Sequence, residues 1–465
     1  MLESIELGNF KAFRNSGKVD LQKINIFVGP NSSGKSSFIK ALLTLRNTIN
    51  SNDNEMVLDL NESIGNFNSV IFNNDIRNRI KIKLYFKERN LVKNNTKIRI
   101  TETILKIMNS DINPSQAMDL ATYSFMGDNE KNKFDKVKFV EFYIKTTKGG
   151  GVIIDEFNIN YNDSDIISIK KDRNSYYMYY NRLLIPEANI VKPYKFFFKV
   201  NQLKITNKLE KSDLEKIILF EYTMEHIEKQ LIEFAKNVSH IDPVRNQVKR
   251  VEYVTNLKFN NTVGHMGENT ITTLVGLEKN IKDDSNISII KDSINKWLNE
   301  FDLGENISIK RLGNDNYSLY IKNKNTGLNC NILDMGVGTS QLLPIIIESI
   351  NSPENAILII EEPESHIHPN AQSKLADLFV DIVKEQNKRF IIETHSMFLI
   401  VKLQILIAQG VIKSDDVCIY YFNQTENGTE TKRMEISENG QFKEAWPSGF
   451  FDVQLQLGKM LFNEL

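Results

Sequence analysis

The chain has 465 residues, of which 41% are hydrophobic and 25% charged, and its formal net charge at pH 7 is −1. This composition is typical of a globular protein with two or three lobes, and the charge argues against a protein that coats nucleic acid through bulk positive charge. No apolar run approaches the ~20 residues that cross a bilayer, and the start "MLESIELGNFKAF" lacks a signal-peptide pattern. The two cysteines lie far apart, which excludes a disulfide framework, so we expect a cytoplasmic protein without membrane association.

The first 50 residues alternate between strand and helix patterns. The stretch "SIELGNFKAF" at 4–13 has β character, and "INIFVG" at 24–29 predicts a short buried strand. The segment 36–49 predicts a helix, because its large apolar residues recur at helical spacing. A strand, a loop and a helix therefore follow one another.

The loop between this strand and this helix carries a phosphate-binding pattern. "GPNSSGKSS" at 29–37 matches G-x-x-x-x-G-K-[ST], in which the glycines let the backbone turn tightly and successive amides face a phosphate. Lys35 adds a positive charge there, and the Ser36 hydroxyl is a ligand for Mg²⁺. The flanking strand and helix disfavour the alternative, a Gly/Ser-rich turn that only caps a helix. The predicted nucleotide-binding residues of this loop are Gly29, Pro30, Asn31, Ser32, Ser33, Gly34, Lys35, Ser36 and Ser37.

From about residue 80 to 206 the pattern changes to β-rich runs such as "IKIKLYF" and "VKFVEFYIKTT". We interpret this region as a largely antiparallel arm inserted into the first lobe. Within it, the basic and aromatic stretch at 170–183 suits either nucleic acid or the two faces of an arm strand, and we favour the strand because the net charge gives no support to the other reading. Residues 211–238 then predict one amphipathic helix, and another helical segment ends near residue 301.

A second glycine-containing loop follows two strands that begin near residue 305. "DMGVGTSQLLP" at 334–344 places two glycines and several polar residues ahead of an apolar helix, which is a further anion site built from backbone donors. The predicted phosphate-contacting residues of this loop are Gly336, Gly338, Ser340 and Gln341. Because one γ-phosphate needs only one such helix end, we predict a dimer in which each ATP lies between the phosphate loop of one subunit and this loop of the other.

Three carboxylates and two histidines follow in "ILIIEEPESHIHP" at 357–369. At the end of this apolar strand, Glu361 is predicted to face Mg²⁺ and Glu362 to act as the general base toward the attacking water. A zinc site formed by the glutamates with His366 and His368 is the alternative, and it is disfavoured because the two histidines have no third partner beyond the adjacent glutamates. Pro369 opens the next helix, so the two histidines become candidates for communication across the dimer.

A helix and another buried strand complete this region. Residues 371–388 are amphipathic and "RFIIETHS" at 389–396 begins as a short strand, so we predict a parallel βαβ crossover. His395 follows that strand, where an imidazole can bond the γ-phosphate and sense its presence. Arg245, in "HIDPVRN", either reaches a phosphate or belongs to a turn stiffened by proline.

Together these motifs resemble a known group of ATPases. The order of "INIFVGPNSSGKSS", "DMGVGTSQLLPII", "LIIEEPESHIHP" and "IIETHS" resembles the ABC-type ATPase heads of the RecF, SMC and OLD group. The phrases are similar to OLD-like AAA ATPase subunits of bacterial antiphage defence systems of the Septu and PARIS type. "QFKEAWPSGFFD" resembles a C-terminal segment of a related bacterial subgroup.

The resemblance implies an α/β fold, namely an ABC-type P-loop ATPase head with a mixed sheet flanked by helices, an inserted β-rich arm and a helical segment. The implied division assigns 1–79 and 304–465 to the head, 80–210 to the arm and 211–303 to the helical segment. The cofactors would be ATP and Mg²⁺, held by the phosphate loop. Glu361 and Glu362 would be the Walker B and catalytic acids, and His395 the switch histidine. The loop from Gly336 to Gln341 would act in trans, while the metal-sensing glutamine of the family has only Asn66 or Asn68 in its region.

Two functions follow from this resemblance. The first is an ATP-hydrolysing sensor or scaffold that forms a homodimer or a higher homo-oligomer through ATP and controls a separate effector protein, a nuclease or another toxin. An intrinsic nuclease is disfavoured, because the residues after "ETHS" lack the acidic cluster of a Toprim domain. The second is a RecF-like ATP-dependent clamp that binds DNA. The absence of heptads argues against long coiled-coil arms.

Overall fold

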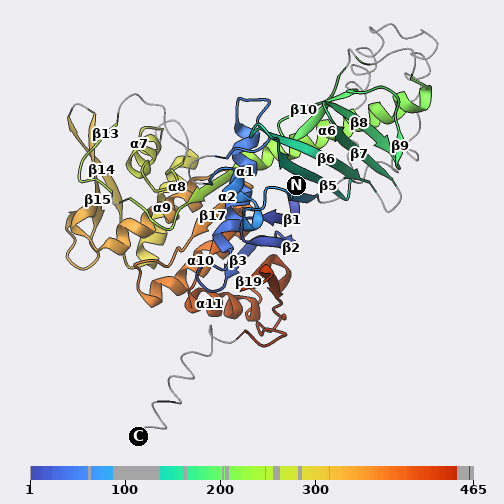
Figure 1. The fold of residues 1–465 in the computed structure, drawn as a ribbon. Helices are drawn as coiled ribbons and strands as arrows, with labels where there is room; N and C mark the ends of the chain where they lie inside the picture. Colours follow the sequence, from blue (N-terminus) through green and yellow to red (C-terminus); the bar gives the residue numbers. More distant parts are fainter. Residues whose placement is uncertain are drawn as a thin grey trace, which may run out of the picture. The chain divides into compact units, whose positions relative to one another are not determined.

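The computed structural model describes residues 2–60, 64–86, 137–161, 165–201, 204, 209–246, 248–254, 262–280, 285–313, 315–447 and 460 (Figure 1). The chain divides into two compact units. Unit 1 comprises Met1–Leu21, Ser37–Lys236 and Gln424–Glu430, and unit 2 comprises Gln22–Ser36, Asn237–Asn423 and Thr431–Leu465. Much of the predicted arm, residues 87–136, lies outside the described residues, as does part of "QFKEAWPSGFFD".

Unit 1 is built on an eight-stranded antiparallel sheet. Its strands, in sheet order, are β2 (Phe13–Asp20), β1 (Leu2–Phe10), β4 (Ile80–Phe86), β5 (Phe139–Thr146), β6 (Val152–Asn160), β7 (Ile166–Asp172), β8 (Ser175–Tyr180) and β9 (Leu183–Leu184). In β4 every second side chain is buried, the pattern of a sheet with one covered face. The prediction of antiparallel strands after residue 80 is confirmed, and these strands continue the sheet of β1 and β2.

Helical and hairpin elements complete unit 1. The long helix α6 (Lys211–Asn237) runs along the strands of this sheet (Figure 1), and the Tyr161 hydroxyl at the end of β6 donates a 2.8 Å hydrogen bond to Thr223 of α6. The hairpin β10 (Val191–Tyr194) and β11 (Phe197–Val200) packs aromatic rings on the sheet, since the rings of Phe142 and Phe196 stack 5.2 Å apart. Two short helices, α2 (Phe67–Val70) and the 3₁₀ helix η1 (Phe72–Asn74), precede β4. The stretch 170–183 forms the β7–β8 hairpin.

Unit 2 is built on a six-stranded sheet. Its strands, in order, are β12 (Val238–Ile241), β17 (Ile357–Glu361), β18 (Arg389–Glu393), β3 (Ile24–Val28), β19 (Val417–Thr425) and β20 (Gly428–Met434), and the first five are parallel. Helix α10 (Pro369–Gln386) joins the parallel neighbours β17 and β18, so the predicted βαβ crossover is confirmed. The helix begins at Pro369, as predicted, and buries its apolar face.

Two helices of unit 2, α9 (Val337–Asn351) and α11 (Met397–Ala408), follow the other predicted motifs. Helix α1 (Lys35–Asn50) starts directly after the phosphate loop; Lys35 and Ser36 belong to unit 2 and the rest of the helix to unit 1. A four-stranded sheet of β13 (Glu252–Tyr253), β15 (Asn316–Lys322), β14 (Ile307–Gly313) and β16 (Asn329–Asn331) packs with α7 (Thr270–Asn280) and α8 (Ser285–Glu300). The 3₁₀ helices η3 (Ile332–Asp334) and η4 (Ser414–Asp416) precede α9 and β19.

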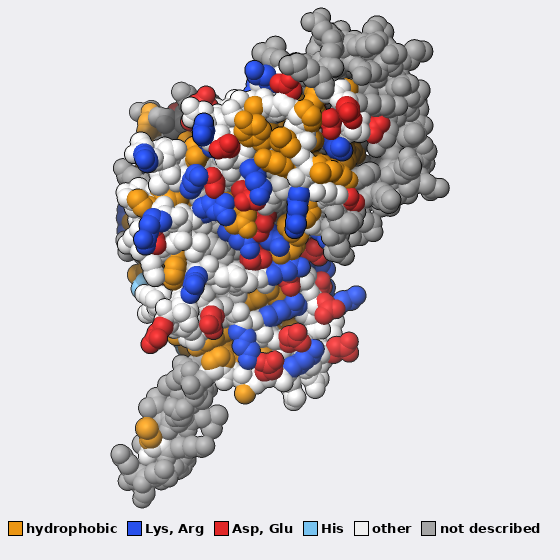
Figure 2. Space-filling model, turned by 45° about the vertical axis from the view of Figure 1, so that its right-hand side comes forward, with side chains coloured by type: hydrophobic (Ala, Val, Ile, Leu, Met, Phe, Trp, Pro, Cys, Tyr) orange, Lys and Arg blue, Asp and Glu red, His pale blue; other side chains and the backbone are white. Residues whose placement is uncertain are grey.

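The surface agrees with the near-neutral net charge. Figure 2 shows Lys and Arg side chains interspersed with Asp and Glu side chains over one face of the molecule. Within the described part of the chain, no helix is long and apolar enough to cross a membrane. The division into 1–79, 80–210, 211–303 and 304–465 stays a prediction, and compactness groups the residues differently, because residues 1–79 supply strands to both large sheets.

Candidate nucleotide-hydrolysis site

The parallel strands of unit 2 end at one edge of the sheet, where most of the predicted site residues gather. Glu361 at the end of β17 lies beside Glu393 at the end of β18, and Glu393 lies beside Phe27 of β3. β3 ends at Val28, and the phosphate loop begins at the next residue, Gly29. Since residues paired in register on parallel strands point to the same face, both carboxylates lie on one face next to the loop.

The phosphate loop is shaped by residues with positive φ. Gly29 has a φ of +146°, Ser32 of +63° and Gly34 of +101°. A Cβ atom at Gly29 would lie 2.2 Å from the carbonyl oxygen of Phe422, so only glycine fits there. The predicted tight turn through the two glycines is therefore present, and Pro30, Asn31 and Ser32 are exposed at its tip, where a ligand can reach their backbone, whereas Ser33 is buried and Ser37 is half-buried.

Lys35, the first residue of α1, is held inside this loop. Its side chain is 3% exposed, and its Nζ donates to the carbonyl oxygens of Gly29 (3.0 Å) and Pro30 (2.9 Å). Burial lowers the pKa of Lys35, and the nearby carboxylates of Glu393 and Glu362 oppose that shift. The ammonium group is thus positioned by the loop backbone at the place where the phosphates are predicted to bind.

Glu393 is a site residue that the motif analysis missed. The Ser36 hydroxyl donates to its two carboxylate oxygens at 3.1 and 2.9 Å, and Lys35 Nζ lies 3.7 Å from Oε1. Burial, and then the charge of Glu361, raise the pKa of Glu393 to about 7. A signal was present, because "RFIIE" has the same form as "ILIIE": a short apolar strand that ends in a glutamate.

Glu361 and Glu362 point to different partners although they are adjacent. Glu361 Oε1 lies 2.7 Å from Nε2 of His240, on β12. Glu362 has a φ of +44°, its N–H donates to the carbonyl oxygen of Glu393 (2.8 Å), and its side chain accepts a hydrogen bond from Ser365 (3.1 Å). This left-handed residue ends the strand and turns the second carboxylate away from the first.

Arg245 stabilises this turn through hydrogen bonds to its backbone. Its guanidinium is 4% exposed, and Nη2 donates to the carbonyl oxygens of Glu361 and Glu362, both at 2.8 Å. Burial lowers the pKa of Arg245 to about 10, so the group remains a cation at neutral pH. Gln341 Nε2 donates to the Arg245 carbonyl oxygen at 3.1 Å, which ties the start of α9 to the same turn. Of the two readings of "HIDPVRN", these contacts support the structural one.

The second glycine-containing loop leads into α9. Gly336 is the N-cap of the helix and has no side chain to cap it, and Val337 is 50% exposed. A Cβ at Gly338 would lie 2.8 Å from the carbonyl oxygen of His366, so this loop packs against the residues that follow Glu362. Ser340 and Gln341 are buried, and Ser340 Oγ donates to the Val337 carbonyl oxygen. Their contact with a nucleotide of another subunit stays a prediction.

The histidines after the carboxylate turn have separate environments. His395 is exposed, its N–H donates to Glu364 Oε1 (2.5 Å), and partial desolvation and Lys35 lower the pKa of its imidazole. His366 is exposed with a φ of +63°. His368 caps α10, because its Nδ1 accepts from the Asn370 N–H at 3.3 Å. Asn66, in unit 1, caps α2 by accepting from the Ser69 N–H.

The side chains at this edge offer two kinds of cation site. Ser36, Glu393 and Glu361 supply oxygen ligands, the donors that Mg²⁺ prefers, so the residues fit the predicted metal. His240, Asp242 and Glu361 form a mixed group in which one ligand atom from each lies within 4.8 Å of the others. Glu361 is therefore a candidate ligand in both cation sites.

A strand, a glycine-rich loop, a lysine and serine at a helix start, and two acidic strand ends define a P-loop ATPase. The family comparison agrees with this class: the profile described as AAA ATPase domain (AAA_15) matches residues 1–400, and the chain belongs to this family. A second profile, described as a protein of unknown function (DUF3696), matches residues 412–456, which include the whole of "QFKEAWPSGFFD". No curated protein matches the chain. The predicted ATPase activity and α/β fold are confirmed at this level.

Several solved structures are similar to the chain at low sequence identity. The SMC head bound to the C-winged helix domain of ScpA shares 12% identity with a TM-score of 0.42, covering 94% of this chain and 98% of that one. The SMC head domain from Thermotoga maritima shares 9% (TM-score 0.36; 94% and 99% covered). The Smc head domain with an extended coiled coil, bound to the C-terminal domain of ScpA derived from Pyrococcus furiosus, shares 10% (TM-score 0.38; 100% and 99% covered).

Proposed function

We propose that the chain binds ATP with Mg²⁺ at the edge of the unit 2 sheet and hydrolyses it as an ABC-type homodimer that controls a separate effector protein, a nuclease or toxin, in bacterial antiphage defence. The observation that carries the catalytic part is the cluster of Lys35, Ser36 and Glu393, with Glu361 in register beside it. The defence role rests on the resemblance of the motif sequences to OLD-like subunits.

Each side chain has a task that its position supports. The loop amides and Lys35 would hold the phosphates, and Ser36 would hold Mg²⁺ together with Glu361 or Glu393. The ion supplies charge neutralisation at the phosphates. Glu362 would accept the proton of the attacking water, because the turn at this residue frees its carboxylate from the strand. His395, exposed and held by its backbone bond to Glu364, would contact the γ-phosphate.

The dimer is supported by the start of α9. This 15-residue helix begins at a glycine without a side-chain cap, beside the exposed Val337. The Thr339 N–H bonds to the Gly336 carbonyl oxygen (2.9 Å), which leaves the N–H groups of Val337 and Gly338 for an anion from outside the chain. A γ-phosphate held by the phosphate loop of a second subunit is such an anion. Closing and opening of the two subunits would then follow ATP binding and hydrolysis, and would control access to the effector.

Two variants with a matched control test the catalytic assignment. We expect Lys35→Ala to abolish ATP binding, and Glu362→Gln to bind ATP but to hydrolyse it at least about 100-fold more slowly, because a general base contributes that much or more. Lys40→Ala, on the same helix α1, is the control for charge removal. Normal hydrolysis by Glu362→Gln would show that the base is another residue.

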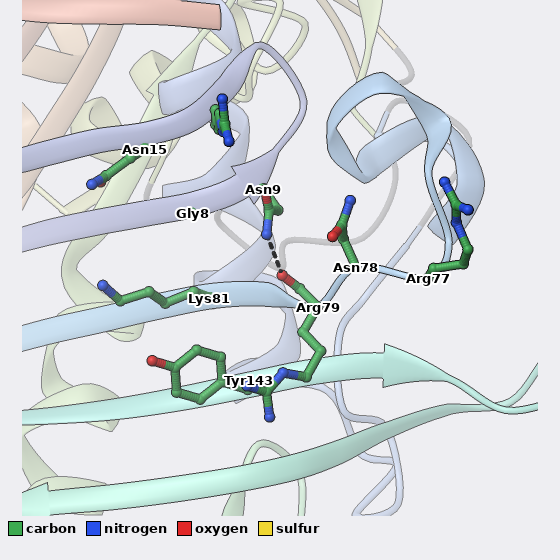
Figure 3. Close-up of a pocket in the computed structure, with 9 residues that line it drawn as sticks. Gly8, Asn9, Asn15, Arg77, Asn78, Arg79, Lys81 and Tyr143 are labelled. Atoms are coloured by element: carbon green, nitrogen blue, oxygen red, sulfur yellow. Dashed lines mark hydrogen bonds between the residues drawn. The ribbon is translucent and has the colours of Figure 1, made fainter. Parts of the chain in front are cut away.

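A cationic hollow in unit 1 favours a second candidate, a RecF-like clamp that binds DNA. The hollow has a volume of about 370 Å³ and lies where β1, β2, β4 and β5 adjoin the segment before β4 (Figure 3). Its lining has four cations, three amides and a phenol but no carboxylate: Gly8, Asn9, Arg14, Asn15, Arg77, Asn78, Arg79, Lys81 and Tyr143. These groups suit the phosphodiester backbone of a nucleic acid.

The four cations differ in how far they are already paired. The Arg14 side chain makes no hydrogen bond or ion pair with any residue that the structure describes, whereas Arg77 pairs with Asp75 and is 87% exposed. Arg79 lies over the Tyr143 ring at 4.4 Å and uses only Nη1 in its ion pairs with Asp155 and Glu156, so its other nitrogens remain donors. Lys81 pairs with Glu6 (2.7 Å) and Glu141 (3.4 Å). Because Arg14 has no carboxylate partner and the exposed Arg77 has one, these are the residues whose loss should weaken DNA binding most.

Salt dependence of DNA binding decides between the candidates. Affinity for DNA falls as the salt concentration rises, so the slope of log affinity against log salt is negative. Under the clamp hypothesis, Arg14→Ala and Arg77→Ala each make this slope less steep by about one, because each removes one phosphate contact. Arg311→Ala, an exposed arginine on β14 that pairs with Asp315 as Arg77 pairs with Asp75, is the control. Equal slopes in all the variants, together with an effector protein that copurifies, would favour the sensor and reject the clamp.

A further inference from the structure

Glu361 has a second set of neighbours on the side of β12, away from the phosphate loop. His240 Nε2 lies 2.7 Å from Glu361 Oε1 and 3.3 Å from Asp242 Oδ1. The three ligand atoms lie within 4.8 Å of one another. All three residues belong to unit 2, and they come from two adjacent strands of its sheet.

The sheet register explains why these three side chains converge. His240 and Asp242 are two residues apart, so they point to the same face of β12 and its extension. Because Ile241 pairs with Ile360, the next residues, Asp242 and Glu361, lie side by side on that face. A parallel pair of strands therefore presents an imidazole and two carboxylates at one spot.

Asp242 is held in place by a fourth residue. Its N–H donates to the carbonyl oxygen of His265 at 2.7 Å, and its Oδ2 lies 2.7 Å from His265 Nδ1. The other oxygen, Oδ1, is the one that faces His240. Carboxylates that bind metal ions are oriented by outer contacts of this kind, which leave one oxygen for the ion.

The charge of this group favours the binding of a cation. The side chains of His240 and Glu361 are only 9% and 12% exposed, and two carboxylates adjoin a single imidazole. Arg245 is near, but the hydrogen bonds of its guanidinium go to backbone carbonyl oxygens. The Asp242 side chain is 29% exposed. A protonated His240 would neutralise one of the two carboxylates, whereas a divalent ion would neutralise both.

We propose that His240, Asp242 and Glu361 bind a divalent transition-metal ion, Zn²⁺ or an ion of similar ligand preference, next to the site of the Mg²⁺ of ATP, which Ser36 and Glu393 would then hold. An imidazole nitrogen with two carboxylate oxygens suits Zn²⁺ better than Mg²⁺, which prefers oxygen ligands alone. Three protein ligands leave one tetrahedral position for water.

The distances agree with such an ion. Ligands about 2.05 Å from a tetrahedral Zn²⁺ are about 3.3 Å from each other. The contact between His240 and Asp242 already has this length, 3.3 Å. The shorter contact of 2.7 Å between His240 and Glu361 is a hydrogen bond, which the ion would replace by moving the two atoms about 0.6 Å apart.

The ion would connect metal binding to the ATPase site through Glu361. In register, Glu361 has Asp242 on one side and Glu393 on the other, and Glu393 contacts Ser36. An ion on the β12 side fixes the Glu361 carboxylate and removes its negative charge from the neighbourhood of Glu393. Zn²⁺ bound here would therefore tune the site at which Mg²⁺ and ATP are predicted to bind.

Zn²⁺ binding without nucleotide tests the proposal. Competition with a chromophoric chelator would give the zinc affinity of the full chain, and mass spectrometry would give its zinc content. The wild-type chain should bind one tight equivalent, and His240→Gln, which can keep a hydrogen bond to Glu361, should bind at least about 100-fold more weakly because it loses a ligand. His265→Ala should weaken binding about 10–100-fold, since it removes only an outer contact.

Two further variants separate this site from other ones. The double variant His366→Ala/His368→Ala removes the exposed histidines after the carboxylate turn and should leave the affinity unchanged. Lys35→Ala should lose ATP but keep zinc, so failure of the proposed ATPase and failure of the metal site are distinguishable. The proposal is overturned if His240→Gln retains wild-type zinc affinity, if the double variant loses it, or if the wild type binds no tight equivalent.

Discussion

Replacing Glu393 by glutamine isolates the electrostatic cost of the crowded carboxylates in the protein without nucleotide or metal. Burial and the neighbouring Glu361 raise the pKa of Glu393 from an ordinary 4.5 to about 7. This rise in pKa corresponds to about 3 kcal/mol of folding free energy. A carboxyl group with a raised pKa favours the fold while it is protonated, so stability falls as the pH rises from 4.5 through 7 and the full penalty applies above that.

Glutamine stays neutral, and its amide oxygen can still accept the hydrogen bond from Ser36. We therefore expect Glu393→Gln to be more stable than the wild type at pH 8, by up to about 3 kcal/mol, and to differ little from it near pH 4.5. Urea unfolding at pH 4.5, 6 and 8 in the presence of a chelator measures the gap, which is the free energy of unfolding of the variant minus that of the wild type. Glu385→Gln, an exposed position on α10, is the control and should show no pH-dependent gap.

The reasoning is refuted if the gap between Glu393→Gln and the wild type does not grow with pH. In that case Glu393 would be ionised at low cost, and its contacts with Lys35 and Ser36 would outweigh its burial. The same conclusion would follow if the stability of the variant relative to the wild type were lower at pH 8 than at pH 4.5.

Two other substitutions test contacts that support the site. Gly29→Ala should lower the free energy of unfolding by at least about 2 kcal/mol and reduce ATP binding. The cause is that an alanine here would need a φ of +146° and would place its Cβ 2.2 Å from the Phe422 carbonyl oxygen. Thermal unfolding measures the first effect and nucleotide titration the second. Arg245→Met should cost about 1–3 kcal/mol for each carbonyl oxygen of Glu361 and Glu362 that loses its donor, and a wild-type unfolding midpoint would show that the turn holds without it.

Regular elements of unit 2 were predictable because their sequence patterns are local. "ILIIE" and "RFIIE" are apolar runs bounded by turns, and α10 repeats its apolar residues at helical spacing, so the strands, the helix and the crossover followed from the sequence. The phosphate loop was predictable for the same reason, since its glycines, lysine and serine lie within nine residues.

Contacts over long sequence distances were not predictable in this way. His240 and Glu361 are 121 residues apart, and their meeting depends on the register of β12 on β17, which neither segment specifies alone. For the same reason the sequence does not specify the partners of Arg245. A metal site within "EEPESHIHP" would use neighbouring residues, whereas the structure brings Glu361 close to His240, on another strand of the sheet, and to Asp242, directly after that strand.

The most direct test of the proposed dimer mixes two inactive variants. Lys35→Ala disables the phosphate loop but leaves the start of α9 intact. Gly336→Asp does the reverse: a side chain at Gly336 has open space around it, its φ of −60° suits any residue, and aspartate is a good N-cap, so the chain should fold while the carboxylate repels a γ-phosphate at this helix end.

If each site combines two subunits, a mixed dimer has one site with both defects and one with neither. ATP hydrolysis by the equimolar mixture should then recover to about a quarter of the wild-type rate, because about half of the dimers are mixed and each has one intact site. A mixture that stays as inactive as its components would contradict the proposal that the loop from Gly336 acts on the ATP of the other subunit.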